Sequence, residues 1–280
     1  MKATLYLIAT PIGNLQDISF RAIDILKNVD LIACEDTRHT GQLLANYSIK
    51  KKVTSLHQHN EKDKTKSILE IIKNGGSVAY VSDAGTPAIS DPGAFLVNQA
   101  HLDNLHITPI PGPSALTTAF SAAGISSNQF QFVGFLPSSL SKCKQALRDI
   151  FAMNMTTILY ESPRRVIKTL TAIVDIFGPE QEVVIGRELT KLFETIYKDK
   201  AILLLNRISQ NPNDQKGEFV IILSRTEKKS PTQSEISDEH VLKVLLSELP
   251  LNQAVKLTAT ILKKKKKEVY NQALEIKNDK

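Results

Sequence analysis

Residues 77–93 read SVAYVSDAGTPAISDPG, a short apolar run that ends in a loop rich in glycine and proline. The run Ser77–Ser82 has the length and the composition of a buried strand. In the loop, glycine allows a ligand to approach the backbone closely, and proline fixes the path of the chain. One such loop is typically only a rigid turn between a strand and a helix, so its meaning depends on whether the pattern recurs.

The pattern recurs through the first half of the chain, where apolar runs alternate with stretches of helical spacing. The predicted strands are Thr4–Ala9, Leu31–Cys34, Val53–Leu56, Ser77–Ser82 and Ile107–Ile110. The predicted helices are Asp17–Asn28, Thr37–Tyr47, Lys62–Asn74 and Ser114–Ala123. This alternation is typical of a mostly parallel α/β sheet that is covered by helices.

A second α/β block follows the first. Its predicted strands are Phe130–Phe135, Thr157–Tyr160, Val183–Ile185, Glu194–Tyr197 and Phe219–Leu223, and its predicted helices are Lys142–Phe151, Arg164–Phe177 and Lys200–Gln210. No helix separates Val183–Ile185 from Glu194–Tyr197, so we expect this sheet to be antiparallel in part.

The end of the chain differs from both blocks. Residues Lys228–Ser237 are polar and contain a Ser-Pro pair, which indicates a linker. Three short helical patterns come after it, at Asp238–Glu248, Asn252–Leu262 and Lys266–Leu274. We therefore expect an N-terminal α/β domain (1–116), a second α/β domain (117–226) and a small C-terminal helical extension (235–280).

The composition is that of an ordinary globular protein, with 42% hydrophobic and 23% charged residues among 280. No apolar run approaches the ~20 residues of a membrane-spanning helix, and the first residues lack the pattern of a signal peptide. The two cysteines, Cys34 and Cys143, form no CxxC pair, which argues against a disulfide framework and a cysteine zinc site. We expect a soluble cytoplasmic protein without a membrane partner.

The charge is basic and unevenly distributed. The chain carries 35 Lys and Arg against 29 Asp and Glu, a net charge of +6, and residues 226–280 contribute half of this excess. Lys263–Lys267 is an unbroken run of lysines, and Lys50–Lys52 is a shorter one. Such runs attract polyanions through counterion release, although a lysine run by itself is more often a solvated helix face. Charge therefore permits a nucleic-acid partner without requiring one.

Ligands of open α/β sheets bind outside the carboxyl ends of the strands. Five loops of the first block follow strands (residues 10–14, 35–39, 57–61, 82–93 and 111–115), and together they predict a nucleoside-type cleft. The chain has no GxxxxGK[ST] and no GxSxG, and no GxGxxG follows the first strand, which disfavours a P-loop, an esterase and an NAD-binding fold. His57 and His59 have no HExxH or cysteine partners, so we expect no metal site.

These loops resemble the motifs of the bacterial ribosomal RNA small subunit methyltransferase I family, which has the tetrapyrrole-methylase fold. The first block carries TPIGNL (10–15), EDTRHT (35–40), SDAGTP (82–87), SDPG (90–93) and PGPSA (111–115). The match continues with GFLP (134–137), YESP (160–163), RELTK (187–191), KGEF (216–219), AVKL (254–257) and KKEVY (266–270). It therefore covers nearly the whole chain. The chain departs from the pattern at Thr86, where tetrapyrrole-methylating relatives carry Asp, and at Lys263–Lys265, where family members tend to show Gly-Leu-Pro.

The resemblance implies two α/β domains with the cofactor cleft between them, and homodimers. It also implies that S-adenosylmethionine serves to methylate the ribose 2′-hydroxyl of a cytidine in the decoding region of 16S rRNA, in the small ribosomal subunit. The residues implied to hold the cofactor are Pro11, Ile12, Gly13, Asp83, Ala84, Gly85, Thr86, Ile89, Ser114, Ala115 and Tyr160.

Methyl transfer to a ribose hydroxyl benefits from a general base that removes the proton. The candidates at strand ends are Glu35, Asp36, His39, His59, Glu61 and Glu188, and we predict Glu35 or Asp36 as the base. Arginines hold phosphates by bidentate contacts. The predicted RNA-binding residues are Arg38, Arg164, Arg165, Arg187, Lys264, Lys265, Lys266 and Lys267. For the candidate bases and the arginines, an equal alternative is a salt bridge that ties loop to loop.

Two other functions stay open on these residues. A methyltransferase of tetrapyrroles or other small molecules would share the fold, but it has no need of a lysine-rich tail. A non-catalytic RNA-binding protein of ribosome assembly would keep the tail, but it would not bind S-adenosylmethionine.

Overall fold

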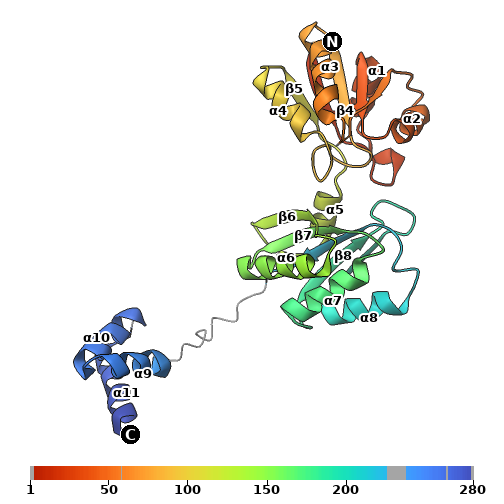
Figure 1. The fold of residues 1–280 in the computed structure, drawn as a ribbon. Helices are drawn as coiled ribbons and strands as arrows, with labels where there is room; N and C mark the ends of the chain where they lie inside the picture. Colours follow the sequence, from red (N-terminus) through yellow and green to blue (C-terminus); the bar gives the residue numbers. More distant parts are fainter. Residues whose placement is uncertain (1–2, 58, 226–237, 263, 279–280) are drawn as a thin grey trace. The chain divides into compact units, whose positions relative to one another are not determined.

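The computed structural model describes residues 3–57, 59–225, 238–262 and 264–278. The chain forms two compact units, residues 1–226 and 227–280, which are drawn in Figure 1. The predicted linker Lys228–Ser237, and with it the predicted boundaries at 226 and 235, lies outside the described residues, as does Lys263.

Five parallel strands form the first sheet, in the order β3-β2-β4-β1-β5. They are β1 (Thr4–Ile8), β2 (Leu31–Cys34), β3 (Val53–Ser55), β4 (Ser77–Val81) and β5 (Ile107–Ile110). The covering helices are α1 (Phe20–Asn28), α2 (Thr37–Asn46), α3 (Glu61–Lys73) and α4 (Ala94–Leu102). Alternate strand residues pack on α1 and α2 on one face and on α3 and α4 on the other, so the sheet is buried on both sides (Figure 1).

The second sheet is mixed, in the order β6-β7-β10-β8-β9, and only the pair β6 and β7 is parallel. Its strands are β6 (Phe130–Phe135), β7 (Thr156–Glu161), β8 (Glu182–Arg187), β9 (Thr195–Lys200) and β10 (Phe219–Leu223). One face packs against α6 (Leu140–Met153), α7 (Val166–Phe177) and α8 (Ala201–Gln210). The expected antiparallel pairing of β8 and β9 is confirmed.

The other face of the second sheet packs against α5 (Ala115–Ala122), which follows β5. Ala119 of α5 lies in one apolar cluster with Ile158, Val184 and Ile222. The predicted domain boundary between residues 116 and 117 therefore falls inside a helix that packs on the second sheet.

The C-terminal unit consists of α9 (Asp238–Glu248), α10 (Leu251–Ile261) and α11 (Lys266–Asn278), which pack on one another. Its centre is apolar and includes Leu242, Val255, Val269 and Ala273. Among the described residues, no helix combines the length and the apolar composition needed to cross a bilayer.

Three elements show the clearest differences between prediction and structure. The predicted helix Asp17–Asn28 is too long, since Leu15–Asp17 forms a separate 3-10 turn and α1 begins after Ser19, whose hydroxyl accepts the N–H of Ala22 at 3.1 Å. Strand β9 extends to Lys200 rather than ending at Tyr197. Helix α4 was not predicted at all.

Candidate active site

The loop that follows β4 is bound to the loop that follows β1. The main-chain groups of Thr10 and Gly85 pair in both directions, with N to O distances of 2.9 and 3.0 Å. The hydroxyl of Thr10 also donates to the carbonyl oxygen of Ser82 at 3.1 Å. Gly85 has a φ of +81°, a left-handed conformation that favours glycine. The two loops therefore form one rim at the carboxyl edge of the first sheet.

The second half of the same loop has a strained backbone. Ala88 and Ser90 have φ values of 65° and 64° although neither is glycine. Gly93 has a φ of 118°, and a Cβ there would lie 2.3 Å from Cε1 of Tyr80. The carboxylate of Glu61 fixes this end, because its Oε1 accepts the N–H of Gly93 at 3.0 Å and two more N–H groups in the first turn of α4. Glu61 thus caps α4.

The second sheet supplies the opposite wall, chiefly through Tyr160 on β7. Its hydroxyl oxygen accepts the N–H of Leu116 at 3.2 Å. The rings of Phe132 and Phe135 contact the Tyr160 ring edge-on, with centroids at 4.8 and 5.8 Å. Such aromatic contacts hold the Tyr160 ring in one orientation.

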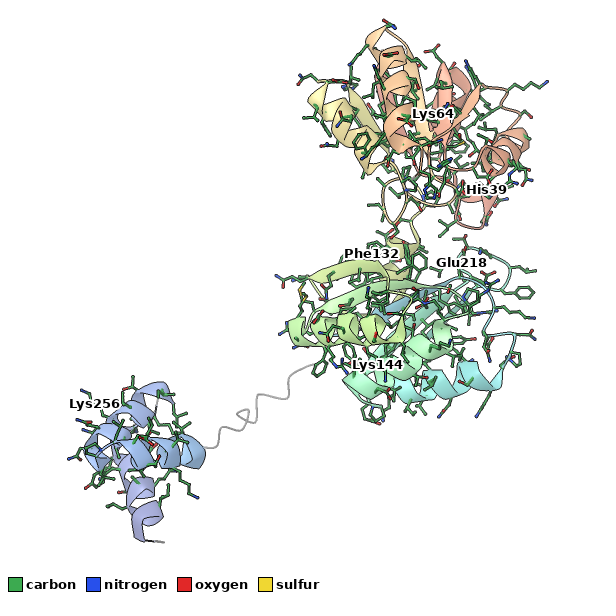
Figure 2. The ribbon with its side chains drawn as sticks, in the orientation of Figure 1. His39, Lys64, Phe132, Lys144, Glu218 and Lys256 are labelled. Carbon is green, nitrogen blue, oxygen red and sulfur yellow. The ribbon has the colours of Figure 1, made fainter. Side chains whose placement is uncertain are left out.

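Two glycines mark close approaches between the two sheets. A Cβ at Gly134, in a bulge of β6, would lie 2.8 Å from Oγ of Ser90. A Cβ at Gly13 would lie 2.4 Å from Cγ of Lys191 and 2.8 Å from Oγ1 of Thr190. A side chain at either glycine would force the loops of the first sheet away from the second. In Figure 2, His39 in the first turn of α2 faces Phe132 of β6 and Glu218, which precedes β10.

Between these walls lies a cavity of about 360 Å³, a volume within the roughly 300–1,000 Å³ of small-molecule sites. Eight of the eleven residues predicted to hold the cofactor line it, namely Ile12, Ala84, Gly85, Thr86, Ile89, Ser114, Ala115 and Tyr160. The other three, Pro11, Gly13 and Asp83, are not among its lining residues. Asp83 instead accepts the N–H of Asp36 at 3.1 Å.

Sequence reasoning did not assign the remaining lining residues. They are Ser90, Asp91, Phe135, Glu161, Ser162, Pro163, Leu189, Glu218, Phe219 and Val220. Most of them belong to the motifs SDPG, YESP, RELTK and KGEF, so the signal was present in the sequence. The resemblance placed Tyr160 of YESP in the cleft between the domains; the neighbouring residues of these motifs were not assigned to it.

The two predicted bases lie in different environments. The Oδ1 of Asp36 accepts the N–H of Arg38 at 2.8 Å, and its Oδ2 lies 2.8 Å from Nη2 of the same residue. These hydrogen bonds hold the pKa of the Asp36 carboxyl well below its usual range. At Glu35, burial and then the charge of Asp83 raise the pKa. Glu35 is therefore the more basic of the pair, and neither is among the cavity's lining residues.

Asp91 is a third carboxylate in this region, and it lines the cavity. Burial, and next the charges of Glu35 and Asp83, raise the pKa of Asp91 to about 6. The hydroxyl of the fully buried Tyr80 has no hydrogen-bond partner in the described part of the chain. Burial near Glu35, Glu61 and Asp91 also raises the pKa of Tyr80. The carboxyl edge of the first sheet thus carries concentrated negative charge.

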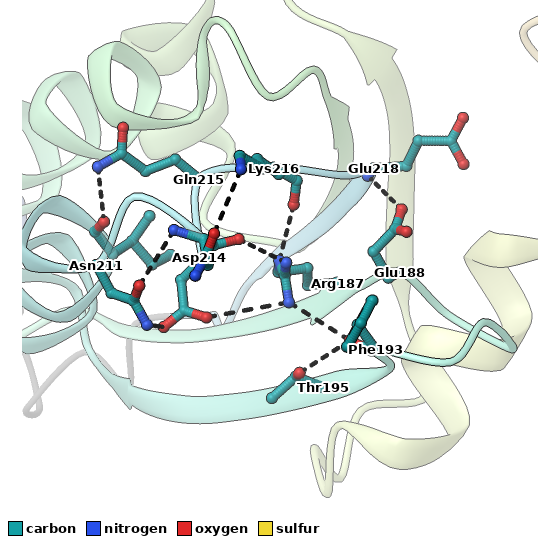
Figure 3. A network of polar contacts seen from close by, with 11 residues as sticks. Arg187, Glu188, Phe193, Thr195, Asn211, Asp214, Gln215, Lys216 and Glu218 are labelled. Atoms are coloured by element: carbon teal, nitrogen blue, oxygen red, sulfur yellow. Dashed lines mark hydrogen bonds and ion pairs between the residues drawn. The ribbon is translucent and has the colours of Figure 1, made fainter.

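Arg187 lies inside the second sheet's loops, as Figure 3 shows. It is 7% exposed, and its guanidinium donates to the carbonyl oxygens of Lys216 at 2.8 Å, Asn213 at 2.6 Å and Phe193 at 3.4 Å. Asp214 lies 4.0 Å away. This geometry favours the alternative of a loop tie, with main-chain oxygens rather than Glu188 as the partners. An RNA contact by Arg187 stays a prediction.

The other predicted arginines differ in whether their guanidinium groups are paired with protein groups and in how exposed they are. Arg165 donates to the carbonyl oxygen of Leu136 at 2.8 Å and lies 3.3 Å from the carboxylate of Glu161. Arg164 is exposed. Arg38 is 88% exposed in its side chain while paired with Asp36. Arg38 and Arg164 are therefore the two that present charge to an approaching phosphate.

The predicted lysines belong to the C-terminal unit. Lys264 and Lys265 precede α11, and Lys266 and Lys267 begin it, with all but Lys264 exposed. Positive charge at a helix N-terminus opposes the helix dipole. Helix stability therefore does not explain these lysines, whereas a contact with phosphate would.

The sequence matches the family described as Tetrapyrrole (Corrin/Porphyrin) Methylases over residues 4–202, and the RsmI C-terminal HTH domain over residues 232–277. It is 44% identical to the Ribosomal RNA small subunit methyltransferase I of Vibrio cholerae, over 97% of this chain and 94% of that protein. The identity to the protein of that name from Haemophilus influenzae is 43%, over 95% and 94%. A diphthine synthase structure, 14% identical, superposes with a TM-score of 0.61 over 79% of this chain and 90% of the other. The predicted fold class is confirmed.

Proposed function

Since the chain belongs to the ribosomal RNA small subunit methyltransferase I proteins of the tetrapyrrole methylase family, we propose that it methylates the ribose 2′-hydroxyl of a cytidine in the decoding region of 16S rRNA, with S-adenosylmethionine as methyl donor. Its relatives' name establishes methylation of small-subunit ribosomal RNA. The cytidine, the 2′-oxygen, the decoding region, the cytoplasm and the homodimer are finer parts of the proposal.

One observation carries the proposal. Loops of both sheets enclose a single cavity, and residues that the family resemblance assigns to the cofactor line it from both sides, such as Gly85 and Tyr160. A protein that only assists ribosome assembly has no need of such a cavity. The lysines at the start of α11, in turn, have no evident use in a methyltransferase of small molecules.

The cavity suits S-adenosylmethionine in its chemistry. Apolar side chains such as Ile12 and Leu189 offer surfaces to an adenine ring, and the backbone of residues 84–86 offers hydrogen-bonding groups beside Gly85. When bound, S-adenosylmethionine supplies a methyl group on a good leaving group.

The chain must hold the acceptor oxygen roughly 3 Å from the methyl carbon, in line with the bond that breaks. Arg38 and Arg164, with Lys265, Lys266 and Lys267 of the C-terminal unit, present exposed charge for RNA phosphates. Of the two predicted bases, Glu35 is the one whose pKa is raised, by burial and then by the charge of Asp83. Asp36 serves as the cap of α2.

The test combines two measurements. Isothermal titration with S-adenosylmethionine measures binding, and transfer of labelled methyl to 30S subunits from cells that lack the enzyme measures the reaction. A 2′-O-methyl group blocks alkaline cleavage at its own nucleotide, so an uncleaved dinucleotide that contains labelled cytidine identifies the site. Binding without label in RNA would favour the small-molecule methyltransferase. Absence of binding would favour the assembly protein.

A further inference from the structure

The cavity wall contains three carboxylates, and two of them are committed to partners. Oε2 of Glu161 accepts the hydroxyl of Thr169 at 2.6 Å and lies 3.3 Å from Nη2 of Arg165. Glu218 pairs with Lys191 at 2.9 Å. Among the residues that the structure describes, no cation lies within ion-pair distance of Asp91. Because Asp91 lines the cavity, its charge is available to the contents of the cavity.

The backbone holds Asp91 in a fixed place. It lies between Ser90, whose backbone is left-handed, and Pro92, whose ring restricts the chain. Ser90 is in turn packed where Gly134 of the second sheet leaves room. Glu61 fixes the following turn through the N–H of Gly93. Strained backbone that is held from several sides is typical of residues positioned for chemistry.

We propose that Asp91 is a catalytic residue, the group that accepts the proton of the acceptor hydroxyl. This inference rests on the function proposed above. The proton passes from the hydroxyl oxygen to a carboxylate oxygen of Asp91, while that hydroxyl oxygen bonds to the methyl carbon. The electron pair of the broken carbon–sulfur bond stays on sulfur, so charge and atoms balance.

The groups around Asp91 support this role. Burial is the largest cause of the raised pKa of Asp91. The charges of Glu35 and Asp83, in the loops after β2 and β4, raise it further, while a hydrogen bond from Ser82 lowers it. Tyr80 of β4 and Tyr160 of β7 complete the surroundings, and the charge of Asp91 contributes to the raised pKa of both. With a pKa of about 6, Asp91 is ionised at neutral pH yet basic enough to take a proton.

The experiment compares the full-length protein with Asp91→Asn, Glu35→Gln and, as a matched control, Asp63→Asn on the exposed surface of α3. Selective carbon labelling of aspartate lets NMR follow the titration of Asp91, assigned by the signal that Asp91→Asn removes. Single-turnover methyl transfer to 30S subunits is measured at saturating S-adenosylmethionine between pH 5 and pH 9, and titration calorimetry gives the cofactor affinity.

We expect the Asp91 signal to titrate near pH 6 and to move to lower pH in Glu35→Gln, because a neighbouring negative charge is lost. The acid limb of the rate profile should follow the same midpoint and the same displacement. Asp91→Asn should slow transfer by about 100-fold or more and abolish that limb, with cofactor affinity changed less than about threefold. Asp63→Asn should match the wild type throughout.

Transfer by Asp91→Asn at the wild-type rate would overturn the inference. A tenfold weaker cofactor affinity with a normal rate at saturation would also overturn it, since the carboxylate would then pair with a cationic group of the cofactor. If the wild-type protein itself transfers no methyl group to the subunits, the proposed function fails before this inference is reached.

Discussion

The hydroxyl oxygen of Tyr160 on β7 accepts the main-chain N–H of Leu116, in the first turn of α5. An N–H in the first turn of a helix has no partner within the helix, so this side chain of the second sheet satisfies the start of the helix that leads away from the first sheet. The bond lies at the cavity, because Tyr160 and the neighbouring Ala115 both line it. It therefore couples the junction of the two sheets to the site.

Tyr160→Phe keeps the ring and removes this acceptor. We expect the free energy of unfolding to fall by about 1 kcal/mol, because the N–H of Leu116 loses its partner, and the affinity for S-adenosylmethionine to weaken. Urea denaturation and titration calorimetry measure the two effects. The control is Tyr197→Phe on β9. The Tyr197 ring lies beneath the guanidinium of Arg207, whose central carbon is 4.0 Å from the ring centre. This variant should leave the affinity for S-adenosylmethionine unchanged. Equal effects of both variants would contradict the role of the Tyr160 hydroxyl.

Gly85→Val tests the rim of the cavity. A Cβ at Gly85 would lie 3.4 Å from Cγ2 of Ile12, and the φ of +81° adds strain. We expect the dissociation constant for S-adenosylmethionine to rise about tenfold or more, with the first sheet still folded by circular dichroism. Gly75→Val is matched in strain, since Gly75 has a φ of +92°, and a Cβ there would meet no atom of the described chain within 4 Å. An unchanged dissociation constant in Gly85→Val would refute the loop assignment.

Asp91→Asn should stabilise the ligand-free protein at neutral pH. The pKa of this carboxyl is about 6 in the folded chain, against an ordinary value of 3.8. Between these values the folded state binds more protons than the unfolded state, so the stability of the wild type falls as pH rises. Asp91 is only partly buried, so solvent screening reduces the full difference, and we expect an effect of about 1–2 kcal/mol. Urea denaturation should show the gain of Asp91→Asn above about pH 6 and almost none near pH 4. If Asp91→Asn stabilised the protein equally at every pH, the raised pKa of the Asp91 carboxyl could not be the cause.

Arg187→Met should destabilise the protein by about 3 kcal/mol, because three carbonyl oxygens lose a charged donor in a buried place. The exposed Arg164→Met should change stability by less than about 0.5 kcal/mol while weakening RNA binding. Thermal denaturation and filter binding to 30S subunits separate the two residues. Normal stability in Arg187→Met would contradict the role of Arg187 in holding the loops together.

Replacing Lys265, Lys266 and Lys267 with Gln should weaken RNA binding and leave the cofactor affinity intact. Each lost phosphate contact should reduce the slope of log affinity against log salt by about 0.7–0.9. The control replaces Lys50, Lys51 and Lys52, a second run of three lysines that precedes β3. An equal loss in both variants would mean that net charge alone, and not the start of α11, attracts the RNA.

The parts of the fold that sequence predicted best are those whose burial shows locally. Strands such as Leu31–Cys34 and Phe219–Leu223 are apolar on both faces and match the structure residue for residue. The outer half of β9 is exposed and polar, and main-chain pairing with β8 holds it, so its extent left no apolar pattern. Helix α4 buries only Leu96 and Ala100 and is capped from Glu61, a contact that no local pattern reveals.

The site shows the same division. The carboxyl-edge rule located the loops of the first sheet, because a parallel order places them together. The order of the second sheet could not be predicted, and so neither could the wall that contains Glu218 and Phe219. Asp91 was missed because its raised pKa comes from burial and then from the charge of Glu35, which is distant in sequence, and both effects exist only in the folded chain.

Within residues 3–225, the chain passes from the first sheet to the second once, through residues 111–114 between β5 and α5. A molecule in the cavity must touch both sheets at the same time, because both contribute its walls. Its binding free energy then adds to whatever holds the sheets together. A ligand in the cavity therefore stabilises the association of the two sheets, in addition to taking part in the reaction. A chain cleaved at residue 112 should stay associated in its presence and separate more readily when it is removed.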